Sequence, residues 1–227
     1  MVIFEPKQQH PHRKLDTVGA IGIMGGTFNP VHFGHLRTAT EVKQNLGLSE
    51  LRLIPCHIPG HRAEPDVSAQ HRIAMLEIAV ADNPGLLVDD RECQSPNTSY
   101  TVKTLESFRE EFGKEKPLLL IMGMDSFSSL HQWHQWQTLL DLAHIVVTHR
   151  PKAPLPTHQV IRTIIEKHLI KNKEALLTSP RGHLWWQTVT SLDISSSQIR
   201  QLLQEQLSPQ YLLPNNVLQY IARHQLY

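Results

Sequence analysis

The chain has 227 residues, of which 40% are apolar and 19% are charged, as in an ordinary soluble globular protein. Its 22 basic and 21 acidic side chains give a formal net charge of +1, which argues against DNA or RNA as a partner but not against a small nucleotide. No apolar run approaches the roughly 20 residues of a membrane helix, so no membrane partner is expected.

The chain begins with a polar segment, residues 1–18, that is rich in Lys, His, Gln and Pro and predicts a flexible extension. It has no apolar stretch typical of a secretory signal. Cys56 and Cys93 are too few for a disulfide framework and lack metal-ligand spacing. These features predict a cytoplasmic protein with two free thiols.

Short apolar segments alternate with helical patterns over residues 19–227, which we expect to form a single domain. Strands are expected at 19–24, 51–54, 86–88, 118–122, 145–148 and 183–187. Helices are expected at 35–46, 68–80, 101–113, 136–142, 159–169, 195–203 and 214–222. This alternation predicts an α/β fold: a doubly wound parallel sheet that binds ligands at the carboxyl ends of its strands, with a small C-terminal helical region.

The first expected strand runs directly into Gly25-Gly26-Thr27-Phe28. Glycines at this place let the backbone approach a phosphate closely and turn its N–H groups toward the anion. The segment has neither the dinucleotide-binding fingerprint nor a Walker loop. Because a glycine pair also occurs in ordinary turns, this motif indicates a phosphate site only together with its neighbours.

The second motif is His32-Phe33-Gly34-His35, at the start of the first expected helix. A helix N-terminus contributes positive potential and free N–H donors, so two imidazoles placed there suit a polyphosphate. Zinc is the alternative ligand, but no third ligand lies nearby in the sequence. The other histidines are scattered without a repeated ligand spacing, which does not favour a metal-binding protein.

The third motif is the segment Ile194 to Arg200, which contains three consecutive serines. Serines at a helix start usually cap the helix, and alone this segment favours that interpretation. Arg200 follows Ser196 by about one helical turn, so hydroxyls, N–H groups and a guanidinium could meet on one anion.

Together these blocks resemble the H-x-G-H nucleotidyltransferase superfamily and, within it, the bacterial nicotinate-nucleotide adenylyltransferases, from Ile21 to the C-terminus. The landmarks between the blocks occur in that family's order: 59–62, 99–101, 123–126, 133 and 149–151. Three features depart from the family pattern. Ser197 stands where Thr is frequent, although the hydroxyl is kept. Asn29 stands where Asp is common, and the loop 55–61 lacks the family's Pro-Asn-x-x-Pro-Pro-His.

The resemblance implies a Rossmann-like fold and transfer of AMP from ATP to nicotinate mononucleotide, with release of pyrophosphate. The 5′-phosphate of the mononucleotide would attack the α-phosphorus in line, without a covalent enzyme intermediate. Mg²⁺ is implied as the cofactor of ATP, bound through the phosphates rather than by direct protein ligands.

The resemblance also assigns residues to roles. It implies that His32 and His35 are catalytic and act on the ATP phosphates. The other residues expected on the ATP side are Gly25, Gly26, Thr27, Phe28, Ser197, Arg200, Gly123, Asp125 and Arg150. Within that set Asp125 holds a ribose or the metal shell or, as an alternative, caps a helix. The residues expected on the mononucleotide side are Thr101, Trp133 and His61, with a core position as the alternative for Trp133.

Several alternative functions stay open at this point. Nicotinamide mononucleotide or phosphopantetheine could be the acceptor on the same fold, although Thr101 and Trp133 favour a pyridine nucleotide and the phosphopantetheine enzymes are much shorter. A non-catalytic nucleotide sensor is a further alternative, against which both histidines and Arg200 argue. A histidine-rich metal-binding protein is the last.

Overall fold

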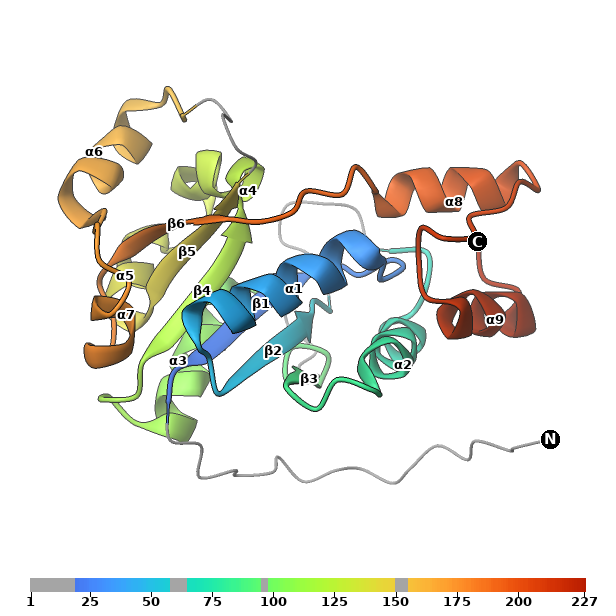
Figure 1. The fold of residues 1–227 in the computed structure, drawn as a ribbon, viewed down its shortest axis with the longest axis horizontal. Coiled ribbons are helices and arrows are strands. Elements are labelled where there is room, and N and C mark those ends of the chain that lie inside the picture. Colours follow the sequence, from blue (N-terminus) through green and yellow to red (C-terminus); the bar gives the residue numbers. More distant parts are fainter. Residues whose placement is uncertain (1–18, 58–64, 95–97, 150–154) are drawn as a thin grey trace.

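The computed structural model describes residues 19–57, 65–94, 98–149 and 155–227. Six strands form one parallel sheet in the order β3-β2-β1-β4-β5-β6 (Figure 1). The strands are β1 Ile21–Gly26, β2 Glu50–Pro55, β3 Leu86–Val88, β4 Leu118–Gly123, β5 His144–His149 and β6 Leu184–Thr188. The sequence-based strand predictions are confirmed to within two residues, and the strand order is that of a Rossmann fold.

Caps that the sequence indicates bound the first two helices. Helix α1, Phe33–Leu46, ends at Gly47 with a φ of 63°, and α2, Ala69–Val80, begins at Ser68, whose hydroxyl accepts from the His71 N–H. The other helices are α3 Thr101–Phe112, α4 Met124–Ser128, α5 Leu139–Leu142, α6 Gln159–His168, α7 Ala175–Thr178, α8 Ser196–Gln204 and α9 Asn215–His224, with 3₁₀ turns at Leu130–Gln132 and Trp136–Thr138. Helices α4 and α7 and the first 3₁₀ turn were not predicted, because such short elements contain too few residues for a periodic pattern.

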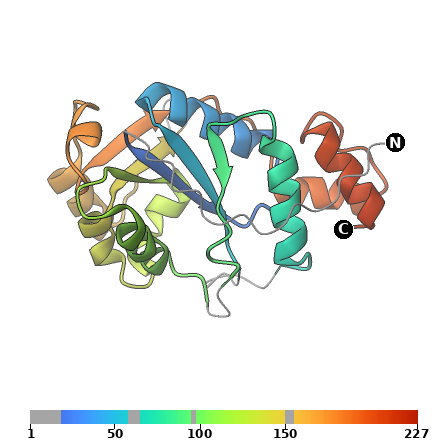
Figure 2. The same ribbon diagram turned by 90° about the horizontal axis from the view of Figure 1, so that it is seen from below.

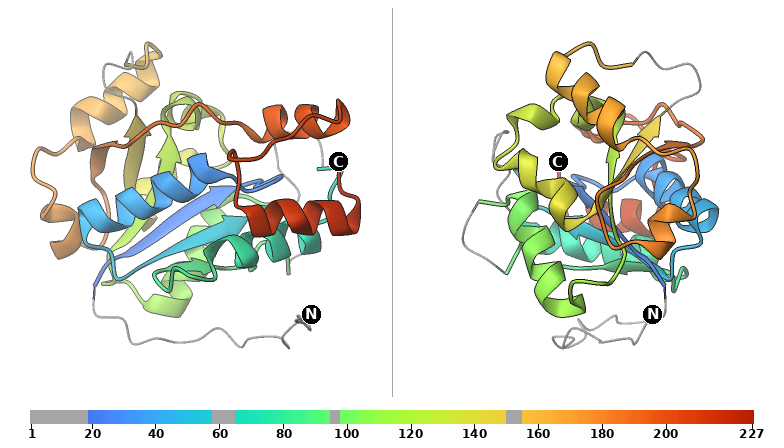
Figure 3. Two further views of the ribbon diagram at one scale, coloured as in Figure 1. Left: turned by 45° about the vertical axis from the view of Figure 1, so that its right-hand side comes forward. Right: turned by 90° about the vertical axis from the view of Figure 1, so that its left-hand side faces the viewer.

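Apolar side chains form a core on each face of the sheet. One core joins the sheet to α1, α2 and α9, and the other joins it to α3, α5 and α6. Figures 2 and 3 show α1 on one side of the sheet and α3 on the other. The predicted doubly wound architecture is therefore confirmed. No helix in the ranges described above is long and apolar enough to cross a membrane.

Helices α8 and α9 form the small helical region expected at the C-terminus (Figure 1). Val217 and Ile221 of α9 are buried in the core that contains α1 and α2. The Asn216 side chain donates to the carbonyl of Ile78 at 3.0 Å, and Phe33 N–H donates to the carbonyl of Leu212 at 3.0 Å. These contacts hold the C-terminal region against α2 and against the beginning of α1, where the histidine motif lies.

Candidate active site

The site is centred on the sheet's topological switch point, where β1 and β4 are neighbours and their connections leave in opposite directions. Gly25 is the last residue but one of β1, and Gly123 ends β4. A Cβ atom built on either glycine would have no heavy atom within 4 Å, and both residues line the same cavity. Glycine at these two positions therefore leaves the backbone open to a ligand.

The loop after β1 fixes the next part of the site. Phe28 has a φ of 49°, in the left-handed region, and its side chain is buried. A Cβ atom on Gly26 would lie 2.9 Å from the Phe28 ring, so only glycine allows the ring to pack there. The Phe28 ring meets the His35 ring edge-on at 5.0 Å. Phe28 thus supports the histidine motif by packing, and only its backbone is available to an anion.

The two histidines of the motif stack on each other. The ring centroids of His32 and His35 are 3.7 Å apart, at an interplanar angle of 27°. A Cβ atom on Gly34 would lie 2.9 Å from Nδ1 of His32, so the glycine between the histidines is needed for the stack. His32 is the N-cap residue of α1, which places both rings at the positive end of that helix.

Both imidazoles are neutral at pH 7 in the free protein. Burial lowers the pKa of His32 to about 4 and that of His35 to about 3, with a further lowering of the His35 pKa by its neighbour. The Nδ1 atoms of both rings are buried and have no hydrogen-bond partner within the described residues. Unpartnered polar atoms are costly, so this arrangement favours a functional explanation over a stabilising one.

The three serines at the start of α8 have different contacts. Ser195 caps the helix, because its hydroxyl accepts from the Gln198 N–H at 3.1 Å. Ser196 donates to the carbonyl of Pro30 at 2.9 Å. The capping interpretation is therefore confirmed for Ser195, while Ser196 joins α8 to the loop that follows β1.

Arg200 makes the second connection between these two segments. Its Nη1 donates to the carbonyl of Asn29 at 2.7 Å, and its Nη2 lies 3.3 Å from the Ser197 hydroxyl. The Asn29 side chain accepts from the Tyr227 hydroxyl at 2.6 Å. Asn29, which departs from the family pattern, is thus buried and anchors the loop from both its backbone and its side chain.

Arg72 of α2 belongs to the same region, although the sequence analysis did not single it out. It is 1% exposed, and its guanidinium donates to the carbonyls of Thr27, His57 and Val67 at 2.9, 3.4 and 3.2 Å. It therefore joins the loops that follow β1 and β2. The sequence carried no signal for this role, because an arginine in an amphipathic helix is usually expected on the exposed face.

A cavity of about 220 Å³ opens beside the β1 and β4 ends. Thr101, at the first position of α3, and Trp133 line it, so the structure brings together the two described residues expected on the mononucleotide side. Five further polar residues line this cavity without having been predicted to bind there: Cys56, Glu92, Ser99, Thr104 and Ser126. His61, also expected on this side, lies outside the described residues.

A larger cavity, of about 620 Å³, lies beyond the ends of β4 and β5. Gly123 lines both cavities, and Asp125 lines the larger one. The alternative that Asp125 caps a helix is wrong: Gly123 is the N-cap residue of α4, and Asp125 lies in its first turn. Arg150, expected on the ATP side, lies outside the described residues. Across the described ranges no three His, Cys, Asp or Glu side chains are close enough together to hold a metal ion.

Comparison with known proteins identifies the family of this chain. The family model described as cytidylyltransferase-like matches residues 23–202. A protein of Methylococcus capsulatus named "Probable nicotinate-nucleotide adenylyltransferase" is 46% identical, over 91% of this chain and 99% of its own. A protein of the same name from Hahella chejuensis is 43% identical, over 91% of this chain and 95% of its own. The chain belongs to the nicotinate-nucleotide adenylyltransferase family.

A solved structure agrees with the observed fold. The nicotinic acid mononucleotide adenylyltransferase of Plasmodium falciparum, solved in complex with NaAD, superimposes with a TM-score of 0.71 over 92% of this chain and 97% of its own. Its sequence identity is 16%, so this likeness supports the Rossmann-like fold alone. The family membership confirms the resemblance drawn from the glycine, histidine and serine–arginine motifs.

Proposed function

We propose that the protein joins ATP and nicotinate mononucleotide at this site, forming nicotinate adenine dinucleotide and pyrophosphate. The observation that carries the proposal is the stacked His32–His35 pair, which lies at the positive end of α1 beside the open glycines of the switch point. A pair of neutral imidazoles suits a polyphosphate, since the anion raises their pKa and engages their N–H groups. The family to which the chain belongs carries this activity by name.

The reaction needs no activated nucleophile from the protein. A phosphate monoester is largely ionised at neutral pH, so its oxygen attacks the α-phosphorus of ATP directly. The new P–O bond forms as the bond to the β-phosphate oxygen breaks, and pyrophosphate leaves with the electron pair. Catalysis then depends on alignment and on charge stabilisation, which we assign to His32 and His35.

The two cavities divide the substrates between them. We assign the nucleoside of ATP to the larger cavity, with Asp125 near its ribose or metal shell. We assign its phosphates to Ser197 and Arg200 and to Gly25, Gly26 and Thr27, which line the neighbouring smaller cavity. We assign the pyridine ring to the smaller cavity, between Thr101 and Trp133. Aromatic faces and hydroxyls suit a flat heteroaromatic ring, which favours a pyridine nucleotide over phosphopantetheine.

Mg²⁺ belongs to this proposal as the partner of ATP. The site fits it, because Mg²⁺ keeps several waters when it is bound through substrate phosphates, and the Asp125 carboxylate in the larger cavity can accept hydrogen bonds from that water shell. When bound, the ion neutralises charge on the leaving pyrophosphate. We also propose a cytoplasmic location, which the two free cysteines support.

The direct test is to incubate the protein with ATP and Mg²⁺ and to measure pyrophosphate release with three acceptors: nicotinate mononucleotide, nicotinamide mononucleotide and phosphopantetheine. We expect the highest kcat/KM with nicotinate mononucleotide. A higher value with either other acceptor would reassign the substrate, and absence of turnover with all three would remove the enzymatic proposal.

A further inference from the structure

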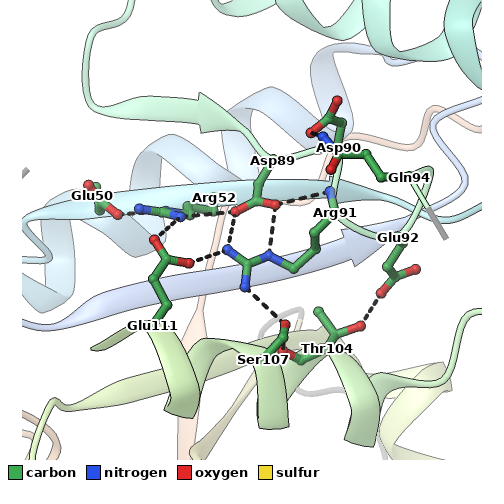
Figure 4. A network of polar contacts seen from close by, with 10 residues as sticks. All are labelled: Glu50, Arg52, Asp89, Asp90, Arg91, Glu92, Gln94, Thr104, Ser107 and Glu111. Atoms are coloured by element: carbon green, nitrogen blue, oxygen red, sulfur yellow. Dashed lines mark hydrogen bonds and ion pairs between the residues drawn. The ribbon is translucent and has the colours of Figure 1, made fainter. Parts of the chain in front are cut away.

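Glu92 is the only charged side chain among the described residues that line the smaller cavity. Its carboxylate accepts a hydrogen bond from the Thr104 hydroxyl at 2.5 Å, as Figure 4 shows, and it is also hydrogen-bonded to Ser99. Burial raises the pKa of Glu92 above its ordinary value, and the two hydrogen bonds offset only part of this rise. Burial of the ionised Glu92 carboxylate therefore costs free energy, and the carboxylate would also face an anionic substrate.

The loop that carries Glu92 is held by a buried ionic network (Figure 4). Arg91 donates to Asp89 at 2.8 and 2.7 Å and to Glu111 at 2.6 Å. Arg52 donates to Asp89 at 3.0 Å and to Glu50 at 2.7 Å. Because these contacts fix Asp89 and Arg91 to β2 and α3, the Glu92 carboxylate has a defined position.

Glu92 also connects the walls of the cavity. Ser99, one of its partners, accepts from the backbone N–H of His57 at 3.0 Å. The carboxylate thus links the segment after β2, the segment after β3 and the start of α3. Thr101, our candidate for the pyridine ring, lies between Ser99 and Thr104, the two residues that Glu92 holds.

We propose that Glu92 is a positioning residue for the acceptor substrate: by holding Ser99 and Thr104 it sets the place of the α3 N-terminus against the pyridine ring. This inference rests on the proposed function. An ionised carboxylate can accept from two hydroxyls at once, one on each oxygen, whereas the side-chain amide of glutamine accepts at one oxygen only. The requirement is therefore for a carboxylate and not for a side chain of that size.

The test is Glu92→Gln, which keeps the shape of the side chain, with kinetics measured in both substrates. We expect the KM for nicotinate mononucleotide to rise about tenfold, as for loss of one hydrogen bond to a charged group, and the KM for ATP to stay within about twofold. Asp90→Asn is the matched control, since it removes a carboxylate from the same loop. The Asp90 side chain bonds to Gln94 and does not line the cavity. This control should keep the wild-type values of both KM.

A second variant makes the test independent of how well Glu92→Gln folds. Thr104→Val removes one of the two hydroxyl partners and should raise the same KM by a smaller factor. Because both changes break one network, the double variant should match Glu92→Gln to within about twofold instead of showing the product of the two effects.

The outcomes separate the two proposals. If the wild-type protein turns over nicotinate mononucleotide and Glu92→Gln leaves its KM unchanged or lowers it, the positioning role of Glu92 is wrong and the proposed function stands. A parallel rise in the KM for ATP would also overturn the role, because it would indicate general damage. If the wild-type protein neither binds nor turns over nicotinate mononucleotide, the proposed function fails and the role of Glu92 fails with it.

Discussion

The phosphate site and the acceptor cavity are adjacent but are built in opposite ways. Two short segments, 25–35 and 195–200, supply most of the phosphate site. The acceptor cavity is lined by residues of β1, β2, β4, α3 and α4 and of the loops between these elements. Chemistry common to many nucleotides can be encoded in a contiguous motif, whereas recognition of one acceptor depends on how distant segments pack.

The two regions also differ in their charged groups. The phosphate site combines neutral imidazoles, a helix N-terminus, Arg200 and the buried Arg72. The acceptor cavity offers hydroxyls, an indole and the carboxylate of Glu92. We expect the first arrangement to attract any polyphosphate and the second to discriminate by shape and hydrogen bonding. Substitutions in the first region should therefore change turnover, and those in the second should change the KM of one substrate.

His35→Ala tests the phosphate side and should have the largest effect. We expect kcat to fall about 10³-fold, because a group that stabilises charge in the transition state is lost, with little change in the thermal midpoint. Steady-state kinetics and thermal unfolding of the same preparation measure both quantities. His71→Ala is the control, since this histidine lies on α2 and contacts Tyr220 instead of the motif. Near wild-type turnover in His35→Ala would contradict the assignment.

The pH dependence of stability tests whether the two imidazoles are buried in their neutral form. The unfolded chain takes up protons on His32 and His35 as the pH falls below about 6.5, whereas the folded protein resists protonation until the pH nears their pKa values of about 4 and about 3. Each imidazole should therefore remove about 1.5 kcal/mol of stability between pH 6.5 and pH 5.

Urea unfolding at these two pH values measures this loss, and the difference between wild type and His35→Asn isolates one imidazole. His144, whose pKa burial also lowers to about 4, contributes equally to both proteins and cancels. If His35→Asn has the same pH dependence as the wild type, His35 is not buried in its neutral form.

The contrast between the regions also explains what could be predicted from the sequence. Strands buried on both faces appear as continuous apolar runs, so the sheet and its order of elements could be read directly. Gly34 and Arg200 were predicted as members of motifs. The structure adds the reason for each: Gly34 leaves space for the His32 ring, and Arg200 donates a hydrogen bond to Asn29. Local sequence was sufficient to identify both motifs, whereas the contact between Arg200 and Asn29 depends on tertiary packing.

The remaining residues could not be predicted because their roles depend on tertiary contacts. Arg72 has the sequence context of a solvent-exposed helical arginine, yet it is buried against three backbone carbonyls. Glu92 follows two acidic residues and a basic one, a pattern that usually indicates an exposed loop. Only the packing of the loop after β3 against α3 brings Glu92 into the cavity.

Trp133 offers the finest test of the comparison, because a second tryptophan lies three residues away. Trp133 lines the acceptor cavity, whereas Trp136 lines a different pocket beside α6, and both pack against the same core. We expect Trp133→Ala to raise the KM for nicotinate mononucleotide about tenfold through loss of ring stacking, with the KM for ATP unchanged. Trp133→Phe keeps an aromatic face and should stay within about threefold of the wild type. Trp136→Ala is the control, because it removes a comparable apolar area. If Trp136→Ala raises the KM for nicotinate mononucleotide as much as Trp133→Ala does, the effect comes from the core. The assignment of Trp133 to the pyridine ring is then wrong.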